Sequence, residues 1–158
     1  MKKLLSSVFV ALTLAGSSYA LTDIQACFNQ ADAKNYQKAV QYGKKAVREY
    51  PKNPSAYVCL AQAYDGTGQR DKAIENLKKA SRYTSNDHAL VYTYDWLGSE
   101  YELKGDYSKD DYSKGDYSNA ILYYRKSLEL SKRLGDVGAE EGNLNNIANV
   151  FRKEGNYS

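Results

Sequence analysis

The chain has 158 residues, of which 42% are hydrophobic and 26% are charged, values typical of one globular domain. This composition disfavours a disordered chain and a multispanning membrane protein. The formal net charge of +3 gives no electrostatic footprint for nucleic acid or anionic lipid. With only one histidine and two cysteines, the sequence offers little for metal or nucleophilic chemistry, so we expect no metal site, no cofactor and no catalytic residues.

Residues 1–20 show, in order, the features of a secretory signal peptide. Two lysines precede an apolar stretch over 4–15, and small residues end at Ala20, so we expect cleavage between Ala20 and Leu21. The alternative is a membrane anchor, but a dozen apolar residues rise only about 18 Å in a helix, and the hydrocarbon core is about 30 Å thick. We therefore expect the mature chain in an exported compartment, the bacterial periplasm or the medium, without a membrane span.

The segment 21–53 is expected to hold two helices, the first from Thr22 to about Ala33 and the second around Ala39 and Gly43. The glycine stands where the later units carry a large residue. A glycine in a helix interior costs about 1 kcal/mol relative to alanine. We therefore expect either local weakness or unusually close packing at this position.

The segment 54–87 predicts a helical hairpin. Asn53 and Pro54 are typical of a helix N-terminus, and Gly68 is typical of a helix end. Apolar and small residues recur at helical spacing and place one face of each helix in the core: Tyr57, Leu60, Ala61 and Tyr64, then Ala73, Leu77 and Ala80.

The segment 91–134 repeats this pattern, with Tyr94-x-x-Leu97-Gly98-x-x-Tyr101 followed by Ala120, Tyr124 and Ser127. Ala39 and Ala73, at equivalent places in the first two units, are 34 residues apart. The motif W-x-x-L-G-x-x-Y followed by A-x-x-x-F, at this period, is that of the tetratricopeptide repeat (TPR), and the sequence resembles this family. The resemblance implies an all-α, right-handed α-solenoid of about three and a half helix-turn-helix units.

Three near-copies of one pentapeptide, KGDYS, KDDYS and KGDYS, fill residues 104–118. Tyr101 and Ala120 are 19 residues apart, whereas Tyr64 and Ala73 are 9 apart, so we interpret the segment as a loop inserted between two helices. A solvated duplication is the favoured interpretation, and a tyrosine-rich contact loop is the alternative. A calcium site is disfavoured because the acid spacing does not match an EF-hand loop; its ligands would be Asp106, Asp110, Asp111 and Asp116.

The segment 141–158 supplies only half of a further unit. Its apolar stripe consists of Leu144, Ile147, Val150 and Phe151. The final Gly-Asn-Tyr-Ser resembles the Gly-Asp-Tyr-Ser that precedes a second helix at 115–118. The segment is expected to be either a terminal capping helix or, as we favour, the start of a repeat that continues in a longer chain.

Arrays of this family bind an extended peptide or a partner helix in a concave groove that the first helices form. The resemblance therefore implies a protein or peptide partner. The groove candidates lie off the core stripe of each first helix: Gln62, Asp65, Tyr92, Asp95, Ser99, Glu102, Asn145, Asn149 and Arg152. We expect a polar lining that is largely acidic in its middle. The first helix offers Ile24 and Phe28 where carboxylate-binding relatives carry basic and amide residues, so that type of binding is not expected.

Two residue pairs within this set suggest opposite kinds of chemistry. Asn145 and Asn149, at i and i+4, point two amides along one line, as in repeats resembling kinesin light chains that hold a peptide backbone. The alternative is that these amides only solvate an end helix. Asp95 and Glu102 are a possible acid pair, but without a histidine or metal partner on a solvated face they do not indicate catalysis.

Cys27 and Cys59 are 32 residues apart, close to one repeat, so they fall on the first helices of adjacent units. A disulfide is possible in an oxidising compartment, and two buried thiols are the alternative. Spacing alone leaves both open.

The sequence thus predicts a non-catalytic module that binds a peptide or protein segment. Two alternatives stay open. One is a structural subunit of an envelope complex that makes its contacts through the ends of the solenoid. The other is the N-terminal TPR part of a longer protein.

Overall fold

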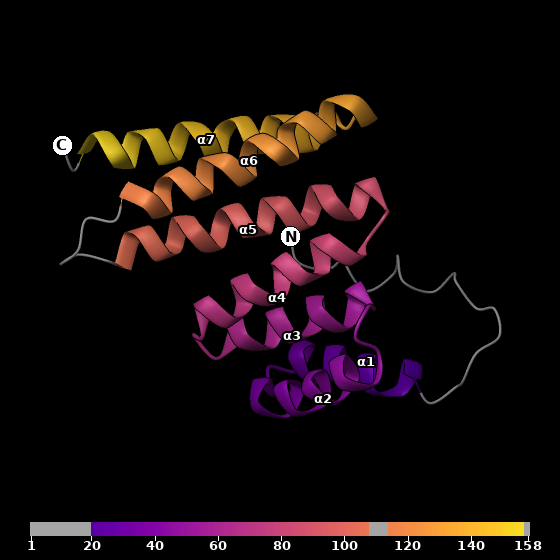
Figure 1. The fold of residues 1–158 in the computed structure, drawn as a ribbon. Coiled ribbons are helices and arrows are strands. Elements are labelled where there is room, and N and C mark those ends of the chain that lie inside the picture. The colour runs from indigo at the N-terminus through magenta and orange to yellow at the C-terminus, as the bar shows by residue number, and fades with distance from the viewer. Residues whose placement is uncertain (1–19, 108–113, 157–158) are drawn as a thin grey trace.

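The computed structural model describes residues 20–107 and 114–156 of the chain, and within these ranges it contains helices but no strand. The helices are α1 (Ala20–Asp32), α2 (Tyr36–Glu49), α3 (Pro54–Gly66), α4 (Arg70–Tyr83), α5 (Asp87–Tyr107), α6 (Lys114–Leu134) and α7 (Val137–Asn156). Figure 1 shows them stacked as successive hairpins, with α7 along α6 at the far end. We call α1, α3, α5 and α7 the first helices, and α2, α4 and α6 the second helices.

The helix ends lie where the sequence places its breaking residues. The side chain of Asn53 accepts a hydrogen bond from the backbone N–H of Ser55 at 2.9 Å, one residue after Pro54. Asn86 caps α5 in the same way, through the backbone N–H of Ala89 at 3.1 Å. Gly68 has a φ of +73°, a conformation that residues with a Cβ rarely adopt. Asn53 and Gly68 confirm the breaks that were predicted for the segment 54–87.

The two flanks of the pentapeptide segment are helical, whereas we expected a loop over 104–118; its middle, 108–113, lies outside the described residues. Helix α5 continues to Tyr107 and α6 begins at Lys114. Tyr117 explains the helical start of α6, because it lies three residues before Ala120 and seven before Tyr124 and is buried with them in one apolar cluster. Helices α5 and α6, which extend into this segment from its two sides, have 21 residues each, where α3 has 13 and α4 has 14.

The first helices of the last two units begin before residues 91 and 141. Helix α5 begins at Asp87 and not at 91, because Asn86 supplies the cap. Helix α7 begins at Val137 and not at 141, because the Asp136 carboxylate accepts the backbone N–H of Ala139 at 3.0 Å. In both cases a single capping side chain determines where the helix starts.

Two main apolar clusters form the core. The first contains Cys27, Ala31, Ala39, Val40, Cys59, Leu60, Ala63, Tyr64 and Ala73. The second contains Ala61, Ile74, Leu77, Leu97, Tyr101, Tyr117, Ala120, Tyr124 and Val150. The first cluster contains residues of the four helices α1, α2, α3 and α4. The second contains residues of α3, α4, α5, α6 and α7, so the two clusters share α3 and α4. The core is therefore continuous along the array.

Cys27 and Cys59 form a disulfide between α1 and α3, with their Cα atoms 6.2 Å apart, and both side chains are buried. Gly43 of α2 lies against this bridge. A Cβ built on Gly43 would lie 3.2 Å from the Cys27 Sγ and 3.0 Å from the Leu60 Cδ1. The glycine thus provides the close packing that was one of the two expectations for this position.

Gly98 of α5 permits a similar close approach in the third unit. A Cβ at this position would lie 2.6 Å from the ring of Tyr124 in α6. Tyr124 is fully buried, so its ring occupies the space that a larger residue at position 98 would need. The glycine and the tyrosine are therefore a matched pair across the α5–α6 contact.

The array divides into two blocks at the α4–α5 contact. The backbones of α1 and α3 approach each other closely, as do those of α5 and α7, but among the described helices the backbones of α3 and α5 do not. The blocks α1–α4 and α5–α7 therefore meet mainly through α4 and α5 (Figure 1).

Candidate binding face

The residues predicted to line the groove belong to the first helices α3, α5 and α7. Two contacts fix how α5 and α7 run beside each other. Asp95 accepts a hydrogen bond from the side chain of Asn146 at 3.1 Å, and Glu102 pairs with Lys153 at 2.8 Å. Both contacts join residues 51 positions apart in sequence, and they lie two helical turns apart, so α5 and α7 run parallel in one register.

The two acids therefore bind within the protein, and the middle of the face is not an open acidic surface. Glu102 also accepts the hydroxyl hydrogen of the buried Tyr124 at 2.8 Å. Burial raises the pKa of Asp95, against the lowering effect of its hydrogen bond from Asn146, and the nearby negative charge of Glu102 raises it further. We conclude that Asp95 and Glu102 hold α5, α6 and α7 together, which leaves neither as an independent acid-base group.

Gln62 and Asp65 of α3 also have partners inside the chain. The Gln62 amide donates to the Asp32 carboxylate of α1 at 3.3 Å. Asp65 lies 3.8 Å from the Arg70 guanidinium. Because both side chains are only half-buried, they contribute to the edge of the face on α3.

The remaining candidates are more accessible. Tyr92 is 63% exposed, Asn145 and Arg152 are exposed, and Ser99 and Asn149 are half-buried. By the register of α5 and α7, Tyr92 is level with Asn143 and Ser99 with Val150, so along the helix axis they lie within one turn of Asn145 and Asn149, respectively. The Arg152 guanidinium donates to the Asn149 side-chain oxygen, which orients that amide. We call Tyr92, Ser99, Asn145, Asn149 and Arg152 the open first-helix face.

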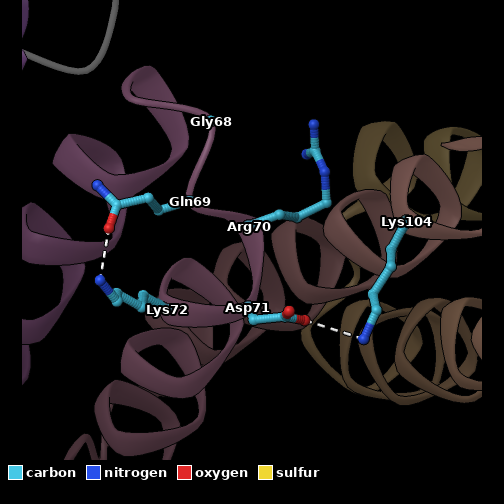
Figure 2. Close-up of a pocket in the computed structure, with 6 residues that line it drawn as sticks. All are labelled: Gly68, Gln69, Arg70, Asp71, Lys72 and Lys104. Carbon is cyan, nitrogen blue, oxygen red and sulfur yellow. Dashed lines mark hydrogen bonds and ion pairs between the residues drawn. The ribbon is translucent and has the colours of Figure 1, made fainter.

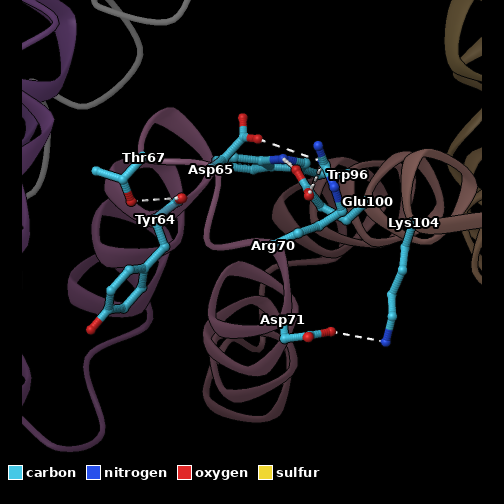
Figure 3. A network of polar contacts seen from close by, with 8 residues as sticks. All are labelled: Tyr64, Asp65, Thr67, Arg70, Asp71, Trp96, Glu100 and Lys104. Atoms are coloured by element: carbon cyan, nitrogen blue, oxygen red, sulfur yellow. Dashed lines mark hydrogen bonds and ion pairs between the residues drawn. The ribbon is translucent and has the colours of Figure 1, made fainter. Parts of the chain in front are cut away.

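A polar network that the sequence analysis missed lies between α3, α4 and α5 (Figure 3). The Glu100 carboxylate, which is 1% exposed, accepts hydrogen bonds from Arg70 at 2.8 Å and from the Trp96 indole at 2.9 Å. Burial raises the pKa of Glu100, and so does the negative charge of Asp65, while Trp96 and Arg70 oppose them. Glu100 lies one residue before a stripe tyrosine, and helical phase predicts only partial exposure there, so no sequence signal pointed to its partners.

A hollow beside this network lies at the start of α4 (Figure 2). It is lined by Gly68, Gln69, Arg70, Asp71, Lys72 and Lys104. Lys104 pairs with Asp71 at 2.9 Å, a hydrogen bond that raises the pKa of the lysine, and Lys72 donates to the Gln69 side chain. None of these residues was a predicted site residue, and their polar groups largely bind one another.

No group of three histidine, cysteine, aspartate or glutamate residues within 20–107 and 114–156 is arranged to hold a metal ion. The disfavoured calcium hypothesis depends on Asp110 and Asp111, which lie outside the described residues. The predicted cleavage site is also not tested, because residues 1–19 lie outside them. Among the helices described, none is long and apolar enough to cross a membrane.

Comparison with protein families supports the resemblance. Two tetratricopeptide repeat models match the sequence, one over residues 30–93 and the other over 112–138, which together make up more than half of the chain. The chain belongs to the tetratricopeptide repeat family. Domains of this family mediate protein–protein interactions and are typically non-catalytic.

Solved structures agree with the fold of this TPR chain. The Sgt2 TPR domain from Aspergillus fumigatus matches with a TM-score of 0.68 and 21% identity, over 91% of this chain and 85% of that one. The structure described as the MamA RS-1 ArsTM double mutant matches with a TM-score of 0.61 and 23% identity, over 74% of this chain. The match spans 58% of the MamA chain. No curated protein matches the sequence.

Proposed function

We propose that this chain is a non-catalytic binding module that holds an extended peptide or protein segment on the open first-helix face of α5 and α7. The observation that supports this most directly is the division of polar groups on that face. The acids Asp95 and Glu102 bind within the protein, whereas Tyr92 and the amides of Asn145 and Asn149 are accessible beside them. The face therefore carries one positive charge, that of Arg152, and otherwise offers neutral donors and acceptors.

Such a face suits a peptide backbone better than a charged ligand. Each asparagine amide can donate and accept, so two amides one turn apart can bind successive peptide groups. Tyr92 adds a flat, largely exposed ring that can pack on a side chain with little loss of conformational entropy. Arg152 is the cation of this set, and it favours an acidic residue at one end of the segment.

The test is a selection of peptides from a random display library on the full chain, followed by calorimetry of the selected peptides. The Tyr92→Ala, Asn145→Ala, Asn149→Ala variant should lose binding. A matched control carries Tyr42→Ala and Gln41→Ala, which remove an exposed tyrosine and an exposed amide from the second helix α2. Loss of binding in the control alone, or in neither variant, would contradict the proposal.

We also propose that the module works in an exported compartment after cleavage between Ala20 and Leu21. The proposal is supported by the order of charged, apolar and small residues in 1–20. The disulfide between Cys27 and Cys59 is compatible with it, because such bridges persist in oxidising compartments. N-terminal sequencing of the protein from a cell fractionation should give Leu21 as the first residue of the exported form. An intact Met1 in the cytosolic fraction would contradict export.

A further inference from the structure

The basic residues of this protein are concentrated on the second helices. Helices α2, α4 and α6 each contain three more basic than acidic residues, whereas the first helices together contain eight more acidic than basic residues. The net charge of +3 for the whole chain conceals this separation. It therefore does not describe the surface that the second helices present to a partner.

Three tyrosine rings of α5 and α6 form a stack beside α4. The rings of Tyr101 in α5 and Tyr123 in α6 are stacked with their centroids 5.6 Å apart, and the ring of Tyr94 lies 6.1 Å from that of Tyr123. Tyr94 and Tyr101 follow Tyr92 and Ser99 by two residues each, which is about 200° around a helix. The stack therefore lies on the side of α5 opposite to the open first-helix face.

Three cations of α4 and α6 surround this stack. The Lys78 Nζ lies 5.2 Å from the centroid of the Tyr101 ring, and the Lys126 Nζ lies 5.0 Å from that of Tyr123. Burial raises the pKa of Tyr123, whereas the positive charges of Lys78 and Arg82 lower it, so Arg82 is near this ring as well. We call Lys78, Arg82 and Lys126 the stack cations.

The stack cations differ from their neighbours because no acid binds them within the part of the chain that the structure describes. On the same two helices, Lys79 pairs with Glu75 at 2.7 Å and Arg133 pairs with Asp87 at 3.0 Å. A tyrosine ring holds an ammonium group in place without neutralising its charge, and the ammonium hydrogens stay available to an acceptor. Since the stack cations are exposed or half-buried, an anion can reach them.

We propose that the stack cations bind the carboxylate side chains of an acidic segment of a partner protein. Side chains on one face of an extended segment are about 7 Å apart, so successive carboxylates can reach cations on both sides of the stack. The half-buried Tyr94 and Tyr123 add hydroxyl groups that can donate to the same carboxylates. This surface lies apart from the open first-helix face, and the inference does not rest on peptide binding there.

The arrangement of the rings favours carboxylates over the bases of a nucleic acid. Single-stranded nucleic acid is held largely by stacking of its bases on exposed aromatic faces. Here the faces of Tyr101 and Tyr123 lie against each other, and Lys78 and Lys126 lie over the same two rings. The groups that remain for a ligand are therefore the cations and the hydroxyls, which suit a carboxylate.

The first test is the fluorescence anisotropy of a labelled poly-glutamate peptide, titrated with the full chain at low ionic strength. We expect saturable binding that weakens as salt is added, because salt screens exposed charges. The Lys78→Gln, Arg82→Gln, Lys126→Gln variant should bind about tenfold more weakly, since three ion pairs are lost. A poly-lysine peptide should not bind. Absence of poly-glutamate binding to the parent would overturn the proposal.

A matched control separates this site from a general effect of positive charge. The Lys38→Gln, Lys44→Gln, Arg48→Gln variant removes the same charge from exposed positions of α2, and it should weaken binding by less than about threefold. Equal losses in the two variants would overturn the proposal. So would tighter binding of single-stranded DNA or of phosphatidylserine vesicles than of poly-glutamate, compared at equal concentrations of negative charge.

A second test remains valid if neutralising the two ring-bound lysines disturbs the fold. Arg82 and Arg48 are both exposed and lie in the last turn of a second helix, α4 and α2 respectively. Arg82→Glu should weaken poly-glutamate binding several times more than Arg48→Glu does, because only the first change puts a negative charge beside the stack. Equal effects of the two reversals would overturn the location of the site.

Discussion

The two blocks of this array are stabilised in different ways. In α1–α4 the helices have 13 or 14 residues, and a disulfide joins the two first helices across a glycine in α2. In α5–α7 the helices have 20 or 21 residues, and the contacts between them are tyrosine rings and buried hydrogen bonds. Short helices bury less surface, and the disulfide adds stability that does not depend on buried area, because it constrains the unfolded chain.

In the block α5–α7, buried hydrogen bonds connect the three helices, whereas a disulfide connects the first helices of α1–α4. The Ser127 hydroxyl of α6 donates to the Val91 carbonyl of α5 at 2.8 Å, and it accepts from the Asn143 amide of α7 at 3.0 Å. Ser127 and Asn143 are fully buried. Buried polar groups that are paired favour one arrangement over its alternatives, because any shift leaves them without partners. The comparison shows that one repeat pattern accommodates either kind of link.

Removing the disulfide should have the largest effect on stability. The Cys27→Ala, Cys59→Ala variant should lose about 3–4 kcal/mol, because the bridge closes a loop of 32 residues in the unfolded chain. Urea unfolding of parent and variant measures the loss. The parent in reductant is the control and should approach the variant. Equal stability of the variant and the oxidised parent would show that the bridge does not stabilise the short block.

Gly98→Ala tests the tight contact in the long block. The new Cβ would lie 2.6 Å from the Tyr124 ring, so the buried ring must shift, at a cost of about 1–3 kcal/mol, partly offset by the better helix propensity of alanine. Urea unfolding should show a net loss. Gly43→Ala is the comparison in the short block, where the nearest side-chain atom lies at 3.0 Å, and its loss should be smaller. A larger loss of unfolding free energy for Gly43→Ala than for Gly98→Ala would contradict this prediction.

Ser127→Ala tests the polar link between α5, α6 and α7. The Asn143 amide loses one of its two acceptors and keeps the Ala139 carbonyl, so we expect a loss of about 1–2 kcal/mol. Hydrogen exchange should show the increased opening in α7 and not in α1–α3. Ser81→Ala is a control, since its hydroxyl binds within α4 and its loss should be close to zero.

Glu100→Gln tests the joint between the two blocks and should have the smallest effect at neutral pH, less than about 1 kcal/mol, because the loss of one of the two bonds, to Arg70 or Trp96, is offset by removal of a buried negative charge. Burial raises the folded pKa of Glu100 above its ordinary value of 4.5. The folded protein therefore binds this proton more tightly than the unfolded chain. Protonation of Glu100 therefore adds to the free energy of unfolding. This stabilisation is fully present below pH 4.5 and is lost as pH rises through the raised pKa of the folded state. The free energy of unfolding should change less in the variant than in the parent between pH 4.5 and the raised pKa of Glu100.

The helical periodicity of α3, α4 and α5 was sufficient to predict these helices and their buried faces. It failed at 104–107 and 114–118, where a turn-like composition concealed the fact that Tyr117 is in phase with Ala120 and Tyr124. It also placed the start of α7 too late, because the cap at Asp136 lies outside the apolar stripe. The periodicity of apolar residues predicts a helix well where buried positions recur along it. It predicts the first residue of a helix poorly where a single capping side chain determines that residue.

For the binding face, the sequence identified which residues leave the core stripe, but not which of them are satisfied within the protein. Asp95 and Glu102 appeared to be open acids, and their partners Asn146 and Lys153 lie 51 residues further along the chain. Glu100 and Arg70, which are joined at 2.8 Å, were not singled out. A contact between distant residues depends on the register of two helices, and a single sequence does not contain that register.

By itself, the sequence determined the repeat family, the alternation of first and second helices and the small residues where helices meet, because these follow from short-range spacing. The tertiary structure decided the pairing of Cys27 with Cys59, the helical conformation of 104–107 and 114–118 at the two flanks of the pentapeptide segment, and which polar groups have partners inside the chain and which are accessible. Those outcomes depend on which surfaces meet when the helices stack, since a side chain's accessibility and pKa are set by neighbours far away in the chain.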